Sequence, residues 1–212
     1  MRILVTGANG QLAKSIRQMM NHFSQAEILF MDRSELDIVN IASTTRIVTR
    51  LDAKYIINCA AYTNVEKAET DIENCMLVNH QGVKNLALAC ENLPTRIIHI
   101  STDYVFDGNS KNPYSETDPC NPINQYGLSK LRGEAELDMG KHIIIRTSWL
   151  YSVYGHNFFR RMWELANRRS EITVVDDQIS SPVYCNELVK FIALCCNQDV
   201  ASGLYNFSNS DA

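Results

Sequence analysis

The chain has 212 residues, of which 45% are hydrophobic and 21% charged, a balance that predicts a soluble globular protein of one large domain, or one domain and part of another. A formal net charge of −4 gives no general attraction for nucleic acid or for an anionic membrane, so we expect neither as a partner. The seven cysteines include no Cys-x-x-Cys pair, and the five histidines lack metal-ligand spacing. These features predict buried free thiols in a cytoplasmic protein without a catalytic metal.

The chain opens with a pattern that is typical of a phosphate-binding turn. Arg2–Thr6 is a short apolar run that predicts a strand buried on both faces, and a helical pattern follows to about Met20. Between them, Gly7 allows a sharp turn and Gly10 lets backbone N–H groups approach a pyrophosphate. Ala13 is small enough for the helix to pack closely on the sheet. We therefore predict a dinucleotide site at this turn.

A second predicted strand, Glu27–Met31, ends at two charged residues. Asp32 lies about 20 residues beyond the glycines, where a carboxylate can accept hydrogen bonds from the adenosine ribose. Arg33 favours adenine stacking or a 2′-phosphate instead, so the choice between NADH and NADPH stays open. Asp37 and Ile38 either contact the adenine or belong to a surface loop.

The next segments predict a helix at 42–51, a strand at 54–59 and helices at 66–69 and 71–92. Small residues at the carboxyl end of a buried strand let a flat cofactor lie against the backbone. We expect such a wall on the nicotinamide side at Ala60, Ala61, Tyr62 and Thr63. Asn79 has apolar neighbours in its helix and is interpreted as a satisfied core amide.

A fourth predicted strand, Arg96–Ile100, leads into a Ser-Thr-Asp sequence. Hydroxyl groups at the carboxyl end of a strand point into the ligand crevice of an open α/β sheet, so Thr102 is placed to donate a hydrogen bond to a substrate carbonyl. The alternative is a turn that satisfies its own backbone. The long polar loop Phe106–Ile123 has the length of a functional loop.

The helical pattern from Ile123 onward carries the most specific chemical signal. Tyr126 and Lys130 are four positions apart, so both side chains leave one face of the helix. An ammonium beside a phenol favours the phenolate, and we expect it to lower the pKa of Tyr126 into a range useful for proton transfer. The alternative is an ordinary amphipathic helix with a solvated lysine.

The remaining pattern predicts a strand at 142–147, a helix at 157–166, a short strand at 172–175, a helix at 187–196 and a last strand at 203–207. Trp149 follows the fifth strand, where it either stacks on a sugar or base or packs in the core. Alternating strands and helices predict an α/β, doubly wound parallel Rossmann-type sheet, with ligands at the strand carboxyl ends. We expect a dinucleotide-binding domain at 1–147 and, at 148–212, the start of a smaller sugar-nucleotide-binding region interleaved with returning Rossmann elements.

Five sequence strings together resemble the extended short-chain dehydrogenase/reductase family, and within it the branch of dTDP-4-dehydrorhamnose reductases. The resemblance covers essentially the whole chain. It rests on Thr-Gly-Ala-Asn-Gly-Gln-Leu at 6–12, Ala-Ala-Tyr-Thr-Asn-Val-Glu-Lys-Ala-Glu at 60–69, Ser-Thr-Asp-Tyr-Val-Phe-Asp-Gly at 101–108, Tyr-Gly-Leu-Ser-Lys at 126–130 and Arg-Thr-Ser-Trp at 146–149.

The resemblance implies NADPH- or NADH-dependent reduction of the 4-keto group of a dTDP-linked 6-deoxyhexose, giving dTDP-L-rhamnose for cell-surface polysaccharide. It implies that Tyr126 donates the proton, that Lys130 holds Tyr126 and the nicotinamide ribose, and that Thr102, Asp103 and Trp149 contact the nucleotide-sugar substrate. It adds Gln11 and Leu12 to the cofactor site. A homo-oligomer is compatible with the sequence.

Three features depart from the family pattern. Ala13 stands for the usual third glycine, and Ser180 and Val183 stand for a glycine and a threonine on the substrate side. Family members also continue beyond the position of Ala212. A reductase of another nucleotide-linked 4-ketosugar and a non-catalytic NAD(P)-binding regulator on the same fold therefore remain alternatives.

Overall fold

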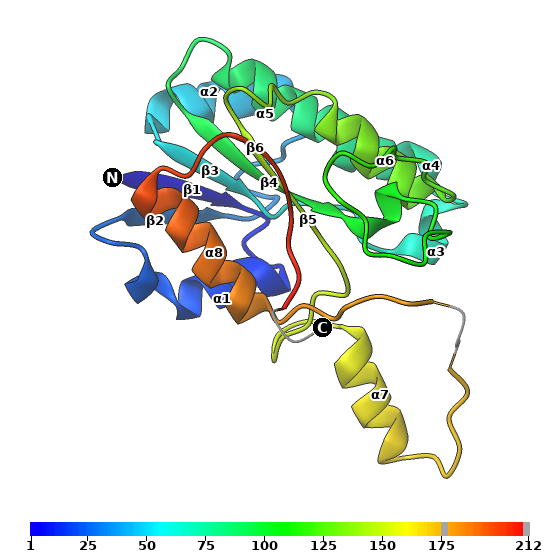
Figure 1. The fold of residues 1–212 in the computed structure, drawn as a ribbon. Helices are drawn as coiled ribbons and strands as arrows, with labels where there is room; N and C mark the ends of the chain where they lie inside the picture. The colour runs from blue at the N-terminus through cyan, green and yellow to red at the C-terminus, as the bar shows by residue number, and fades with distance from the viewer. Residues whose placement is uncertain (175–177, 210–212) are drawn as a thin grey trace.

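A single parallel sheet organises the protein, as the computed structural model shows for residues 1–174 and 178–209 (Figure 1). Its strand order is β2-β1-β3-β4-β5-β6, and every neighbouring pair is parallel. The strands are β1 (Arg2–Thr6), β2 (Glu27–Met31), β3 (Tyr55–Asn58), β4 (Arg96–Thr102), β5 (Ile143–Thr147) and β6 (Gly203–Asn206). The chain moves outward from β1 to β2 and then crosses back to β3, which places the switch point of the topology between β1 and β3.

Helices cover both faces of this sheet, so the predicted doubly wound fold is confirmed. On one face α1 packs against α8, and on the other α2 packs against α5, with α6 beside them (Figure 1). The α-helices are α1 (Gln11–Gln18), α2 (Ile41–Leu51), α3 (Val65–Ala68), α4 (Ile72–Met76), α5 (Gly82–Cys90), α6 (Gln125–Glu134), α7 (Phe158–Ala166) and α8 (Cys185–Gln198). The shorter turns are the 3-10 helices η1 (Met20–His22) and η3 (Asp103–Val105) and the π-helix η2 (Leu77–Gln81).

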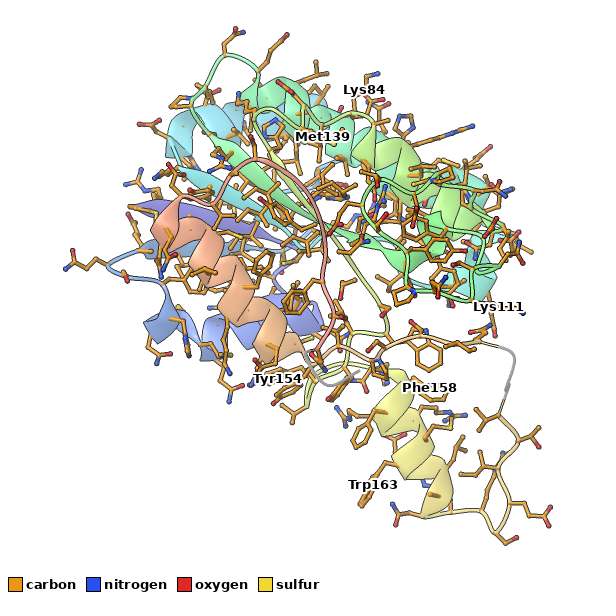
Figure 2. All side chains as sticks on the ribbon, viewed as in Figure 1. Lys84, Lys111, Met139, Tyr154, Phe158 and Trp163 are labelled. Atoms are coloured by element: carbon orange, nitrogen blue, oxygen red, sulfur yellow. The ribbon has the colours of Figure 1, made fainter. Side chains whose placement is uncertain are left out.

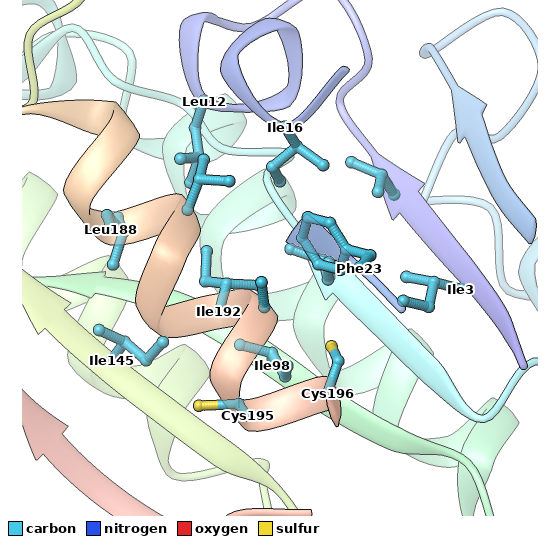
Figure 3. Close-up of a cluster of buried hydrophobic side chains, with 14 of the residues drawn as sticks. Ile3, Leu12, Ile16, Phe23, Ile98, Ile145, Leu188, Ile192, Cys195 and Cys196 are labelled. Carbon is cyan, nitrogen blue, oxygen red and sulfur yellow. The ribbon is translucent and has the colours of Figure 1, made fainter. Parts of the chain in front are cut away.

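Two apolar clusters hold the layers together. In the first, Leu12 and Ile16 of α1 pack with Leu188 and Ile192 of α8 over the central strands (Figure 3). The second lies on the opposite face and includes Leu86 of α5. The isoleucine-rich strands are buried on both faces, which is why they appear in the sequence as continuous apolar runs.

Three predicted elements differ in the structure. The helix predicted at 71–92 is divided into α4, η2 and α5, because the π-helical turn interrupts the α-helical hydrogen bonds. The short strand predicted at 172–175 is wrong for 172–174, which form no strand, and Val175 lies outside the described residues. Ser101 and Thr102, predicted to follow a strand, are its last residues, because β5 continues to pair with them.

The helix α7 lies apart from the sheet (Figure 1). Phe158 and Trp163 project from it (Figure 2), and its sequence also contains Phe159 and the charged residues Arg160, Arg161 and Glu164. None of its nine residues, all of them described, is buried. No helix within 1–174 and 178–209 is both long enough and apolar enough to cross a membrane. All seven cysteines are free thiols, and five of them are buried.

Candidate active site

A cleft of about 330 Å³ opens at the switch point between β1 and β3. The turn after β1, the end of β2 and the segment after β3 form its walls, so it lies at the edge where ligands bind in sheets of this kind. Nine of the predicted cofactor-site residues line it, namely Gly7, Gly10, Asp32, Arg33, Asp37, Ile38, Ala60, Ala61 and Tyr62. Asn9, Leu36, Cys59 and Val78 also line it and were missed. Asn9 lies within the string at 6–12 but was given no role there, and the other three belong to no recognisable motif.

The turn after β1 is shaped for close approach of a ligand. Gly7 has φ +64°, and a Cβ there would lie 2.7 Å from the backbone nitrogen of Ala60, so only glycine fits. The N-cap of α1 is Gly10, which offers no side-chain acceptor to the first N–H groups of the helix, and the first turn contains no acidic residue. Free N–H groups and the positive end of the helix dipole favour an anion at this position.

The acidic end of β2 is held in a fixed orientation. One carboxylate oxygen of Asp32 accepts from the backbone N–H (2.8 Å) and hydroxyl (2.6 Å) of Ser34, and the other accepts from Asn9 at 3.1 Å. These hydrogen bonds lower the pKa of Asp32, so it is ionised at neutral pH. Arg33 pairs with Asp37 at 3.4 Å, but its side chain is 80% exposed and therefore accessible to a ligand.

The start of α6 places Tyr126 and Lys130 at the same edge of the sheet. Asn124 caps the helix by accepting from the N–H of Gly127 at 2.7 Å. Gly127 touches the backbone carbonyl of Tyr104 so closely that a Cβ would clash, which brings α6 against the end of β4. As a result the half-buried Tyr126 lies beside the hydroxyl of Thr102, and its ring packs edge-on to Tyr104 at 5.8 Å.

The predicted effect of the lysine on the tyrosine is wrong for this structure. Burial raises the pKa of Tyr126, and the neighbouring Thr102 hydroxyl offsets only part of the rise. The amine of Lys130 turns toward β4 instead, where Nζ donates to the carbonyl oxygen of Ile100 at 2.7 Å and lies 3.3 Å from Nε2 of His99. Burial also lowers the pKa of Lys130 to about 8.

Thr102 and Asp103 form a small hydrogen-bonded cluster on the substrate side. Oγ1 of Thr102 donates to Asp103 Oδ1 at 3.1 Å and accepts from the backbone N–H of Tyr104 at 3.2 Å. Oγ of Ser180 donates to the other oxygen of Asp103 at 2.9 Å. Burial raises the pKa of Asp103. The single hydroxyl hydrogen of Thr102 is therefore already donated to Asp103, and a substrate carbonyl must displace Asp103 to accept it.

Besides Thr102, Asp103, Tyr126 and Lys130, four further predicted residues do not line the cleft: Gln11, Leu12, Thr63 and Trp149. The side chain of Gln11 donates to the carbonyl oxygen of Leu150 at 3.0 Å and ties α1 to the segment after β5. Leu12 is buried in the core (Figure 3), and Thr63 is exposed beyond the cleft wall. Trp149 has φ +40°, a strained conformation for a tryptophan, and its ring lies 5.2 Å from that of Phe158.

Asn79 is a satisfied core amide, as predicted, but it also supports the cleft. Its Oδ1 accepts from the N–H of Tyr62 at 2.9 Å, while Nδ2 donates to the Tyr62 carbonyl oxygen at 3.0 Å and to Ser129 at 2.9 Å. The π-helical turn η2 directs this side chain between the cleft wall and α6. The bulge itself has no sequence signature that could have revealed this contact.

Comparison with known proteins identifies the family. A family model described as the RmlD substrate binding domain matches residues 1–212. The chain belongs to this family. A dTDP-4-dehydrorhamnose reductase of Aggregatibacter actinomycetemcomitans is 39% identical over 98% of this chain and 73% of its own length.

Two further relatives bear on the site. A dTDP-4-keto-6-deoxy-D-glucose reductase of Streptomyces niveus is 38% identical over 97% of this chain and 72% of its own. The crystal structure of the dTDP-4-dehydrorhamnose reductase of Bacillus anthracis in complex with NADP superposes with a TM-score of 0.94 at 39% identity, covering 99% of this chain and 74% of that one. The predicted family resemblance is thereby confirmed.

Proposed function

We propose that this protein reduces the 4-keto group of dTDP-4-dehydrorhamnose to give dTDP-L-rhamnose, with NADPH or NADH as the hydride source. The observation that carries the proposal is the meeting of Tyr126, Thr102 and Lys130 at the sheet edge that also holds the glycine-turn cleft. Membership of the RmlD family and a relative named for this reaction support the substrate.

The residues of the cleft fit a dinucleotide. Gly7 leaves no space for a side chain against Ala60, and the uncapped start of α1 offers N–H groups to a pyrophosphate. Asp32 would accept from ribose hydroxyls, while the exposed Arg33 suits a 2′-phosphate. Arg33 and the NADP-bound relative support NADPH as the preferred cofactor. When bound, the nicotinamide supplies the hydride.

The catalytic groups divide the work of protonation. Tyr126 donates its phenolic proton to the C4 oxygen as the substrate carbonyl becomes an alkoxide, and the raised pKa of this tyrosine keeps the proton on the phenol beforehand. Thr102 donates a hydrogen bond to the same oxygen, exchanging its contact with Asp103. Lys130 lies one helical turn from Tyr126, and although its amine contacts β4 rather than the phenol, its charge would act on the remaining phenolate through space.

The sugar-binding part of the site is proposed to begin after β5. Residues 1–147 would form the dinucleotide-binding domain, and the segment from 148 onward would begin the substrate region, with Asp103 and Trp149 facing the sugar nucleotide. The contact between Ser180 and Asp103 joins the two parts. The free thiols suit the reducing cytoplasm.

A second candidate substrate is dTDP-4-keto-6-deoxy-D-glucose, because the Streptomyces niveus relative is named for its reduction and is 38% identical. The two sugars differ in stereochemistry rather than in functional groups, so their discrimination depends on how the ring sits over Thr102 and Tyr126.

The test follows the absorbance of NADPH at fixed enzyme concentration with each of the two 4-keto sugar nucleotides. We expect kcat/KM to be at least about tenfold higher with dTDP-4-dehydrorhamnose. A reversed ratio would assign the second substrate. Cofactor binding without oxidation in the presence of either sugar would instead favour a non-catalytic NAD(P)-binding regulator.

A further inference from the structure

A row of buried polar side chains crosses the sheet next to the candidate active site. Thr6, Asn58 and His99 are register partners on β1, β3 and β4, and Lys130 completes the row from α6. Each of the four is at most 2% exposed. Buried polar groups are costly unless each has a hydrogen-bond partner, so the contacts along the row must be mutually consistent.

The contacts are continuous from the cleft wall to the lysine. The N–H of Ala60 donates to Thr6 Oγ1 at 3.3 Å, and this hydroxyl lies 2.7 Å from Oδ1 of Asn58. Asn58 Nδ2 is 3.1 Å from Nδ1 of His99. Nε2 of His99 is 3.3 Å from Nζ of Lys130. The row therefore connects Ala60, which lies against the glycine turn at Gly7, with Lys130 of the proposed catalytic group.

The number of hydrogens on His99 fixes the direction of these bonds. Burial lowers the pKa of His99 well below its usual value, so the ring is neutral and carries a single N–H. A charged Lys130 can only donate, so Nε2 must accept, Nδ1 must carry the hydrogen, and the amide of Asn58 must turn its oxygen toward the ring. An uncharged Lys130 also has a lone pair, so it permits the reverse arrangement, in which His99 Nε2–H donates to the amine, Nδ1 accepts and Asn58 presents its Nδ2, as in this structure.

We propose that His99 is a positioning residue for Lys130, and that its tautomer follows the charge of this lysine while Asn58 turns its amide to match. Among the described residues, Nζ of Lys130 forms hydrogen bonds only with His99 and the Ile100 carbonyl. His99 thus directs the ammonium toward β4. The consequence for catalysis rests on the proposed function, in which the charge of Lys130 stabilises the Tyr126 phenolate.

Other groups facing the lysine do not replace this contact. The carboxylate of Glu134, one turn further along α6, and the thiols of Cys59 and Cys75 favour the charged amine through space. None of them forms a hydrogen bond with Nζ in the described structure. Removing the acceptor on His99 should therefore make the charged form of Lys130 less stable.

The main test is an NMR titration of the Lys130 side chain in protein labelled with ¹³C-lysine, with the signal assigned from the Lys130→Arg spectrum. We expect His99→Phe to lower the titration midpoint of Lys130 by about one pH unit. His99→Gln retains a polar group near the position of Nε2, so it should recover at least half of the lost midpoint.

The matched control is His142→Phe. His142, directly before β5, is 3% exposed and accepts from the N–H of Ile97 in β4, so its loss should reduce stability and leave the Lys130 midpoint unchanged. An unchanged midpoint in His99→Phe would overturn the proposal.

A second measurement needs no variant at His99 and decides the question if His99→Phe does not fold. The ¹⁵N chemical shifts of His99 in the wild-type protein should show the Nδ1–H tautomer at pH 6 and a change to Nε2–H as Lys130 loses its charge near pH 8. An Nε2–H tautomer at pH 6 would contradict the proposal. So would a tautomer that stays the same over the pH range in which Lys130 loses its charge. Neither measurement uses a substrate, so an enzyme inactive toward both sugar nucleotides would remove the proposed function and leave this inference standing.

Discussion

The helices α6 and α7 begin in the same way and differ in what they bury. Each is capped by an asparagine whose side chain accepts from the N–H three residues on, at 2.7 Å for Asn124 and 3.0 Å for Asn157. Yet α6 buries Lys130 and Glu134. The helix α7 buries no residue and leaves Trp163 67% exposed.

The difference shows that a helix pattern alone does not reveal how the helix is used. Burying a lysine and a glutamate on α6 costs free energy that apolar side chains would not cost, and such groups persist where chemistry needs them. The aromatic side chains of α7 are largely exposed, and their ring contacts are those of Phe158 with Trp149 and of Phe159 with Tyr151, so they add little to the stability of the described fold. We therefore expect substitutions in α6 to be costly and those in α7 to be mild.

The largest effect should come from removing one hydroxyl group from α6. Tyr126→Phe deletes the proposed proton donor and should lower kcat by between about a hundredfold and ten-thousandfold, with NADPH binding retained. Turnover is measured by NADPH absorbance and binding by NADPH fluorescence.

The matched variant is Tyr154→Phe, which removes a phenolic hydroxyl near α7. Among the described residues this hydroxyl forms a hydrogen bond only with the side chain of Gln18. It should keep wild-type turnover. Near wild-type kcat in Tyr126→Phe would remove this tyrosine from the mechanism.

The next effect concerns the buried ion pair of α6. Glu134 and Arg146 meet at 2.7 Å, with side chains 7% and 6% exposed, and Ser101 also donates to the carboxylate. Glu134→Ala leaves the guanidinium buried without its partner, so the free energy of unfolding should fall by about 3–5 kcal/mol in urea denaturation.

An exposed pair on α8 provides the comparison. Glu187 pairs with Lys190 at 2.8 Å and is 46% exposed, so Glu187→Ala should cost less than about 1 kcal/mol. Equal losses in the two variants would mean that burial on α6 has no special cost.

The pH dependence of the free energy of unfolding measures how much the burial of Lys130 on α6 costs. Its pKa is about 8 in the folded protein and 10.5 for a free lysine, so between these values the unfolded chain binds more protons than the folded one. The wild-type protein should therefore gain stability relative to Lys130→Met as the pH rises from 8 to 10.5, by about 3 kcal/mol in total.

Below pH 8 the lysine is charged in both states, and the burial penalty is fully present. Urea denaturation of both proteins at a series of pH values measures the difference. Parallel pH curves would show that Lys130 keeps its ordinary pKa in the fold.

Sequence patterns predicted the sheet and the meeting of Tyr126 with Thr102, because both depend on local features. Apolar runs bounded by glycine or polar residues define the strands, and the helical spacing of Tyr126 and Lys130 places both at one edge. The direction of the lysine amine depends on His99, which is 31 residues away in the chain. His99 lies within Ile-Ile-His-Ile, where it has the appearance of a core strand residue.

Two other differences have the same cause. The β-branched residues at 172–174 favour a strand, but the described structure offers them no neighbouring strand, and a strand without a partner is not stable. The pKa of Tyr126 is set by burial under the contacts of α6 with β4 and η3, which the helix sequence alone does not contain. Local patterns thus predict elements, whereas long-range contacts determine the electrostatics of the site.

The smallest effect is expected for a substitution on α7, and it tests whether this helix is as exposed in solution as it is in the structure. Trp163 is 67% exposed, so Trp163→Ser removes little apolar contact and should change the free energy of unfolding by no more than about 0.5 kcal/mol. Ile192→Ala on α8, where the side chain is fully buried, should cost about 2–5 kcal/mol. If Trp163→Ser instead destabilises the protein as strongly as Ile192→Ala, then the aromatic face of α7 is covered in solution, and α7 belongs to the folded core as fully as α6 does.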